Sequence, residues 1–142
     1  MPEQNFTIFV SHAALDYEIA VSMKEFITNA FPEVRVFVSS DPEDLMPGDE
    51  WVQKILNALK SAKVVLTVCT ARGLGRKWVW FEAGRTWFTD VPLIPCCIGD
   101  IRKGNLPAPF AGLMALHIDE SRDVAALFGW LSSRVMVAAK SS

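Results

Sequence analysis

Residues 64–69 read Val-Val-Leu-Thr-Val-Cys, and every one of them except Thr67 is apolar. A short apolar run rich in β-branched residues is typical of a strand that is covered on both faces. Such strands belong to the parallel sheets of α/β proteins, because the helices that connect parallel strands pack against both faces. The stretch therefore predicts the central strand of a parallel sheet.

Strand-like and helix-like segments alternate on both sides of this stretch. Residues 6–10 and 34–38 predict two strands before it, and residues 91–98 and 113–118 predict two strands after it. Apolar residues recur at helical spacing after each of the first three strands and after the last, where a helix is expected to begin near Ser121. Four helices should therefore connect and cover five strands.

This order of elements predicts an α/β fold of the flavodoxin-like type, with five parallel strands in the order 2-1-3-4-5 and helices on both faces. Residues 1–142 then form a single domain. Pro92 and Pro95 indicate that the fourth strand is irregular or lies near an edge of the sheet. Ligands of such sheets bind beyond the carboxyl ends of the strands where the winding reverses, here between the first and third strands.

The composition excludes several classes of protein. Hydrophobic residues make up 51% of the chain and charged residues 21%, so the chain has enough apolar surface to fold. The net charge is −2, and the densest basic cluster, Arg72, Arg76 and Lys77, is too small for a nucleic-acid interface. No apolar run approaches the length of a membrane span. We therefore expect neither nucleic acid nor a membrane as the partner.

The chain has three cysteines, Cys69, Cys96 and Cys97. An odd number does not make a closed disulfide framework, and adjacent cysteines rarely bridge each other. No Cys-x-x-Cys or Cys/His ligand spacing is present, so the sequence predicts no metal site, and His117 is expected to be structural. The N-terminus lacks the basic and apolar regions of a signal peptide. Reduced, buried cysteines and a cytoplasmic location are the resulting expectations.

The segment Trp78-Val79-Trp80-Phe81-Glu82-Ala83-Gly84 holds one carboxylate among three aromatic side chains. An ionised glutamate in such surroundings is costly unless it is paired or used. On a helix Trp78 and Glu82 share one face, and an ion pair between Glu82 and Arg85 is one explanation of the acid. The other is a functional carboxylate, because Glu82 would lie roughly 7 Å from the start of its helix, within reach of the crevice.

Two further segments border the same crevice. Ser11 and His12 follow the first strand, and His12 either contacts a ligand or fills a turn. Residues 39–48 form a long acidic loop after the second strand, and loops of this length are often functional. Asp49 is a candidate N-cap of the next helix, and Trp51 either anchors the core or stacks on a base.

The edge lacks the residues of several familiar sites. The third strand ends in Cys69 where a phosphoacceptor receiver domain needs an aspartate. The segment Gly73-Leu74-Gly75 follows the wrong strand for a dinucleotide fingerprint, and Asn105 stands where a P-loop needs a lysine. A nucleotide would therefore be bound by other means.

Several of these segments together resemble TIR domains (Toll/interleukin-receptor homology). Phe9-Val10-Ser11-His12 followed by Asp16 is similar to the box that ends the first strand of those domains. Val36-Phe37-Val38, leading through the acidic loop to Pro47-Gly48-Asp49, is similar to their second box, the BB loop. Trp78 and Glu82 match the Trp-x-x-x-Glu signature of TIR domains that cleave NAD⁺. The resemblance extends over nearly the whole chain, and Phe81-Glu82-Ala83-Gly84 and Ile94-Pro95 also resemble bacterial members of the family.

The resemblance implies an NAD⁺ glycohydrolase that releases nicotinamide and forms ADP-ribose or a cyclic ADP-ribose isomer, with NAD⁺ as substrate and no cofactor. Nicotinamide leaves as a neutral molecule, so the site must chiefly stabilise the oxocarbenium character of the ribose. The resemblance assigns this role to Glu82, with Trp78 forming the wall beside it. It also implies contacts to the ribose and phosphates from Ser11, His12, Ser39 and Asp49.

The family also implies partners. An effector of a prokaryotic immune or stress response would act through head-to-tail assembly of TIR protomers, together with a sensor domain or partner chain outside this sequence. The acidic residues of the 39–48 loop and the basic cluster of residues 72–77 are complementary surfaces for such a contact.

Two other functions remain open at this point. A TIR domain can serve as a non-catalytic scaffold for TIR–TIR interaction, although a scaffold has no need of Trp78 and Glu82. A nucleoside deoxyribosyltransferase-like enzyme shares the architecture and uses a glutamate, but the Ser11-His12 box and the Pro47-Gly48 loop argue against it.

Overall fold

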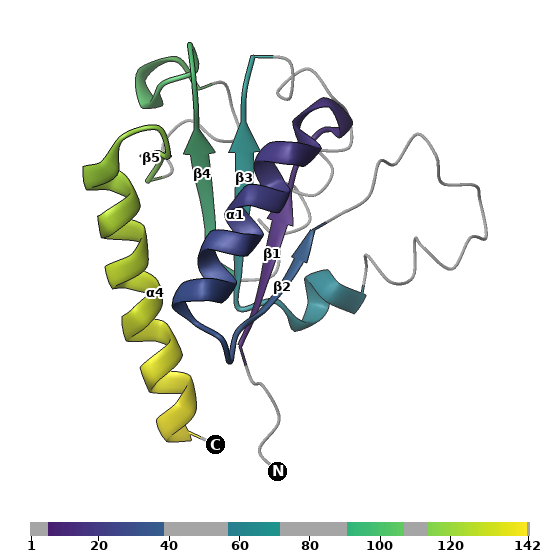
Figure 1. Ribbon diagram of the computed structural model, residues 1–142, viewed down its shortest axis with the longest axis vertical. Coiled ribbons are helices and arrows are strands. Elements are labelled where there is room, and N and C mark those ends of the chain that lie inside the picture. The colour runs from purple at the N-terminus through teal and green to yellow at the C-terminus, as the bar shows by residue number, and fades with distance from the viewer. Residues whose placement is uncertain (1–5, 39–56, 72–90, 107–113, 142) are drawn as a thin grey trace, which may run out of the picture.

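The computed structural model describes residues 6–38, 57–71, 91–106 and 114–141. Within these residues five parallel strands form one sheet in the order β2-β1-β3-β4-β5 (Figure 1). The strands are β1 (Thr7–Ser11), β2 (Arg35–Val38), β3 (Val64–Cys69), β4 (Leu93–Cys97) and β5 (Leu116–His117). The predicted α/β fold and strand order are confirmed.

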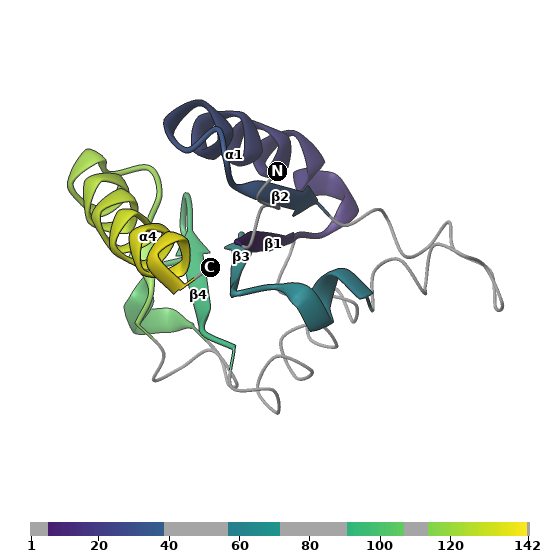
Figure 2. The same cartoon turned by 90° about the horizontal axis from the view of Figure 1, so that it is seen from below.

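Helices cover both faces of this sheet. Figure 2 shows α1 (Tyr17–Ala30) and α4 (Ser121–Ser141) side by side on one face, and the helical residues 57–61 on the other. α1 connects β1 to β2, and α4 follows β5. The sheet is therefore the middle layer of three. Among the described residues, none of the helices is both long enough and apolar enough to cross a bilayer.

β3 is the centre of the sheet, as its apolar sequence predicts. All six of its residues are buried, and it pairs with β1 on one side and with β4 on the other. In this register Ser11 lies opposite Thr67, and Cys69 lies opposite Cys97. Because directly paired residues of parallel strands point to the same face, each of these pairs brings two side chains together.

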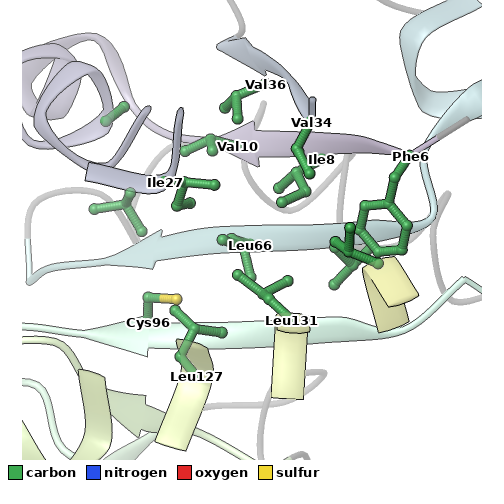
Figure 3. Packing of buried hydrophobic residues seen from close by; sticks show 14 residues of the cluster. Phe6, Ile8, Val10, Ile27, Val34, Val36, Leu66, Cys96, Leu127 and Leu131 are labelled. Carbon is green, nitrogen blue, oxygen red and sulfur yellow. The ribbon is translucent and has the colours of Figure 1, made fainter. Parts of the chain in front are cut away.

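The main core lies between the sheet and the pair α1 and α4 (Figure 3). Ile8, Leu66, Ile27 and Leu131 meet there, each with 0–1% of its surface exposed. Burying a side chain of this size stabilises the fold by about 1.5–3 kcal/mol relative to leaving it in water. A second apolar cluster, on the opposite face, packs Phe9 and Val65 against the helical segment that contains Leu59. Both faces of the sheet are therefore dry, as a parallel sheet requires.

The structure shifts several boundaries that the sequence suggested. β1 includes Ser11, which was expected to follow the strand, and β5 spans only Leu116–His117. A 3-10 turn over Ala14–Asp16 precedes α1. Because that turn has three residues per turn instead of 3.6, it moves Leu15 out of the helical stripe, and Leu15 is 62% exposed.

The expectation that the fourth strand lies near an edge is confirmed. β4 is next to the edge strand β5, which pairs only with Cys96 and Cys97. Pro95 pairs with Thr67 of β3 and has no β5 partner opposite it. A proline is tolerated there because only one neighbouring strand requires its hydrogen-bonding groups.

Candidate functional site

The carboxyl ends of β1 and β3 lie next to each other at the edge where the winding of the sheet reverses (Figure 1). One chain segment leaves β1 toward α1, and another leaves β3 toward residues 72–90. Crevices of doubly wound sheets form at such a reversal. The polar side chains of these two strand ends, residues 11–16 and 67–70, are the described part of the candidate site.

Two buried hydroxyl groups mark this edge of the sheet. Ser11 and Thr67 are Cα partners on neighbouring strands, and both side chains are completely buried. Within the described part of the chain, neither Ser11 Oγ nor Thr67 Oγ1 has a hydrogen-bond partner. Leaving a buried polar group unpaired costs about 1–3 kcal/mol. The pair is therefore a polar feature that the packing of the fold does not explain.

His12 is held in a defined orientation directly after β1. Its Nδ1–H donates to the carbonyl oxygen of Ala13 at 2.7 Å, since a carbonyl can only accept. The ring packs on Tyr17 with a centroid distance of 5.6 Å and is completely buried. In the neutral imidazole this bond leaves Nε2 as the acceptor nitrogen. The packing fixes the ring, which is the arrangement expected of a histidine that fills a turn.

A second hydrogen bond joins the two strand ends. Thr70 Oγ1 donates to Asp16 Oδ2 at 2.6 Å, and both residues are buried. Asp16 is also anchored through its backbone, because its N–H donates to the carbonyl oxygen of Ala13 at 2.9 Å. Asp16 therefore fixes the position of the segment after β3 relative to the segment after β1.

Thr67 and Thr70 provide a matched pair of substitutions with opposite expected effects. Thr67→Val removes an unpaired buried hydroxyl at constant shape, so it should stabilise the fold by about 1–3 kcal/mol. Thr70→Val removes the buried hydroxyl that donates to Asp16 Oδ2, so it should destabilise the fold by about 1–3 kcal/mol. Urea unfolding of both variants measures the two changes. A loss of stability in Thr67→Val would show that its hydroxyl has a partner in solution.

Two thiols meet at the ends of β3 and β4. Cys69 and Cys97 are Cα partners in the sheet, and both side chains are completely buried. The Cys69 thiol donates to the carbonyl oxygen of Thr67 at 3.4 Å. The interaction with Cys97, together with burial, raises the pKa of Cys69, while the interaction with Cys69 and the charge of Arg102 lower the pKa of Cys97. Burial raises the pKa of Cys96 to about 12. All three cysteines are free and buried, as the sequence predicted.

Thiol reactivity should follow this order. We expect all three thiols of the native protein to react slowly with a disulfide reagent at neutral pH, because none is exposed. Cys97 should react first, since its lowered pKa gives it the largest thiolate fraction. Mass spectrometry of the partially labelled protein identifies the site. Faster labelling of Cys96 than of Cys97 would contradict this arrangement, and full labelling in denaturant serves as the control.

The structure places only some of the residues that the sequence singled out. Ser11 and His12 lie at the predicted edge. The other predicted site residues lie outside the described residues: Ser39, Asp49, Trp51, Trp78 and Glu82.

The sequence placed Thr70 at this edge and Asp16 in the box after the first strand, but it predicted neither the bond between them nor the unpaired hydroxyl of Thr67. Asp16 lies where the sequence predicts the first turn of a helix, and acids at that position are commonly exposed. Nothing in the sequence indicates that Asp16 is buried. Thr67 did carry a signal, because it is the one hydroxyl in an otherwise apolar strand. The bond from Thr70 spans 54 positions and follows from the sheet register alone.

The order of strands and the polar edge between β1 and β3 define a doubly wound α/β protein with its site at the switch point. The sequence matches the TIR domain family over residues 8–128, and the chain belongs to this family. TIR domains act in signalling and TIR–TIR interaction, and the family includes members that cleave NAD⁺. No curated protein matches the chain.

Proposed function

We propose that this TIR domain cleaves NAD⁺ between nicotinamide and ribose, as an effector of the bacterial NAD-cleaving type. The observation that carries the proposal is the sequence pattern Trp78-x-x-x-Glu82 in the segment that follows β3 of a TIR domain. The fold supports it, because β3 neighbours β1 at the switch point, where ligands of such sheets bind.

The proposed reaction needs one well-placed carboxylate. The bond between ribose C1′ and the nicotinamide nitrogen breaks, and its electron pair neutralises the pyridinium. Water then adds to C1′ and releases its proton to solvent, which gives ADP-ribose, or a nitrogen of adenine adds and gives a cyclic isomer. The carboxylate of Glu82 stabilises the positive charge that develops on the ribose and hydrogen-bonds its hydroxyls.

The described edge offers groups that suit the remainder of NAD⁺. The hydroxyl of Ser11 has no partner among the described residues, which supports a contact to the ribose or a phosphate once this completely buried side chain is uncovered. His12 lies beside it, but its completely buried ring must turn or be uncovered before it can touch a substrate. We further assign substrate contacts outside the described residues to Ser39, Asp49, Trp51 and Trp78.

Assembly completes the proposal. Residues 1–142 act as one TIR domain in the cytoplasm, and head-to-tail contacts between protomers bring the acidic loop 39–48 against the basic cluster of residues 72–77. A sensor domain or partner chain outside this sequence would bring the protomers together.

One alternative is a TIR domain that only mediates interaction. Apolar side chains exposed on and before α1 favour it, because Leu15, Tyr17 and Phe26 are 53–62% exposed and would be suited to a protein partner. The two functions differ in one measurable product, which is free nicotinamide.

The decisive experiment incubates the purified protein with NAD⁺ and follows nicotinamide and the adenine-containing product by chromatography. The protein is assayed both dilute and clustered on vesicles through an affinity tag, since assembly is part of the proposal. Nicotinamide release that rises with clustering supports the enzyme. If no nicotinamide forms under either condition, the interaction module remains as the function of this domain.

A further inference from the structure

A second polar cluster lies at the end of β5, two strands away from β3. His117 ends β5, Glu120 lies in the following turn, and Asp123 lies in the first turn of α4. His117 Nδ1 is 3.1 Å from Glu120 Oε2 and 3.1 Å from Asp123 Oδ2. The three ligand-type atoms all lie within 4.8 Å of one another. An imidazole and two carboxylates from three successive pieces of structure therefore converge on one point.

The convergence of two carboxylates on a single nitrogen fits a shared cation. Nδ1 of an imidazole has one position in the ring plane, which holds either one proton or one lone pair. A proton there can make one well-aligned hydrogen bond, yet two carboxylate oxygens approach at the same distance. A metal ion at the centre would satisfy all three atoms at once, because the ion accepts a lone pair from each.

The two distances from His117 Nδ1 agree with ligation. Zinc lies about 2.0–2.2 Å from histidine nitrogen and carboxylate oxygen, which places neighbouring ligand atoms about 3–3.5 Å apart. Both measured separations from Nδ1 are 3.1 Å. One ligand is also fixed in advance, because the backbone N–H of His117 donates to Asp123 Oδ2 at 2.8 Å. Such outer contacts orient metal ligands and keep them deprotonated.

The local charges suit a divalent cation. The ligand set carries two carboxylates and a neutral imidazole, which together balance a charge of +2. Two described arginines lie near these acids: Arg122 acts on Asp123, and Arg102 Nη1 is 3.7 Å from Glu120 Oε2 but 2.9 Å from Asp119 Oδ1. Asp119 also accepts from the backbone N–H of Gly99, which holds it beside Arg102. Arg102 therefore pairs chiefly with Asp119, and its contact with Glu120 is the longer one.

We propose that His117, Glu120 and Asp123 bind one divalent transition-metal ion of the Zn²⁺ class. Imidazole with carboxylate suits Zn²⁺, Co²⁺ or Ni²⁺, whereas Mg²⁺ and Ca²⁺ prefer oxygen ligands alone. The Glu120 side chain is 52% exposed, so the site is open to solvent and water completes the coordination. The ion links the end of β5 to the first turn of α4, the helix that supplies Leu131 to the core.

The site escapes sequence analysis for a physical reason. Metal sites are found in sequences through Cys-x-x-Cys or His-rich spacing, and this cluster has neither. Its spacing of three and three residues becomes a site only because a tight turn, with Glu120 N–H donating to the carbonyl oxygen of His117, reverses the chain before α4.

Titration of the metal-free protein with Zn²⁺ and Co²⁺ tests the proposal. We expect one ion per chain, a higher unfolding temperature with Zn²⁺, and a shift of the His117 imidazole resonances. Excess Mg²⁺ should not compete. Glu120→Gln and Asp123→Asn should each weaken Zn²⁺ binding at least about tenfold, because even the loss of an outer partner costs about 10–100-fold. Asp123→Asn keeps an oxygen that can accept from the His117 N–H, so folding should survive.

The control is Glu33→Gln, which removes an exposed carboxylate elsewhere and should leave the affinity unchanged. Unaltered Zn²⁺ affinity in both ligand variants overturns the proposal. A sulfur-to-cobalt charge-transfer band in the Co²⁺ complex also overturns it, since that band assigns the ion to cysteine. His117 resonances that respond to pH and not to Zn²⁺ overturn it as well, in favour of an imidazolium paired with the two acids.

Discussion

Glu82→Gln should lower the rate of nicotinamide release from NAD⁺ by about two or more powers of ten. The amide keeps the size of the side chain and its ability to hydrogen-bond the ribose, but it lacks the negative charge that stabilises an oxocarbenium-like transition state. Because that charge matters mainly in the transition state, the loss should be in kcat more than in KM. Initial rates from chromatography of nicotinamide measure it.

The comparison requires a variant with the same chemical change elsewhere. Glu25→Gln replaces an exposed glutamate on α1 and should keep the full rate. Circular dichroism and unfolding temperature confirm that both variants are folded. Full activity in Glu82→Gln would remove this residue from the mechanism, and an inactive wild-type protein would remove the enzyme itself. The two failures are thus distinguishable.

Leu131→Ala should reduce the free energy of unfolding by about 2–5 kcal/mol. Leu131 is completely buried where α4 packs on the sheet, next to Leu66 and Leu127 (Figure 3). The truncation removes apolar surface from the core and leaves a cavity that the rigid strands around it cannot fill. Urea unfolding followed by circular dichroism measures the loss.

Met136→Ala is the matched control on the same helix. Met136 is 57% exposed, so its truncation changes little burial and should alter stability by no more than about 0.5 kcal/mol. A similar loss in both variants would mean that α4 is not packed on the sheet as described. A large loss in Leu131→Ala alone identifies the buried stripe of α4 as a main source of stability.

The sequence predicts the fold well because the decisive signals are local. The apolar run of β3 identifies a strand that is covered on both faces, and alternation with helical patterns leaves few topologies. Pro95 is likewise interpretable from sequence, since a proline restricts where its strand can lie. The boundaries of helices and strands are less predictable. Leu15 lies in the 3-10 turn before α1 and is exposed, and the spacing of apolar residues does not predict such a turn.

The candidate site is predictable only where its residues lie at strand ends. Ser11 and His12 were found because the end of β1 must lie at the switch point. The bond between Asp16 and Thr70 and the contact between Cys69 and Cys97 depend on strand register, which joins residues far apart in sequence. The contacts of Glu120 and Asp123 with His117 depend on the geometry of the turn between β5 and α4. Such contacts follow from tertiary structure and not from spacing.

The position of α4 after the last strand has a consequence for synthesis on the ribosome. Leu127, Leu131 and Val135 close one side of the core, and the ribosome adds them after all five strands. Until then the nascent chain carries a sheet face, including Leu66 and Cys96, that α1 covers only in part because α4 is still missing. Apolar surface of this kind binds chaperones or aggregates in incompletely made chains. Arrest of translation before residue 121 should therefore yield a product that is retained by chaperones, whereas release after α4 should yield a folded domain.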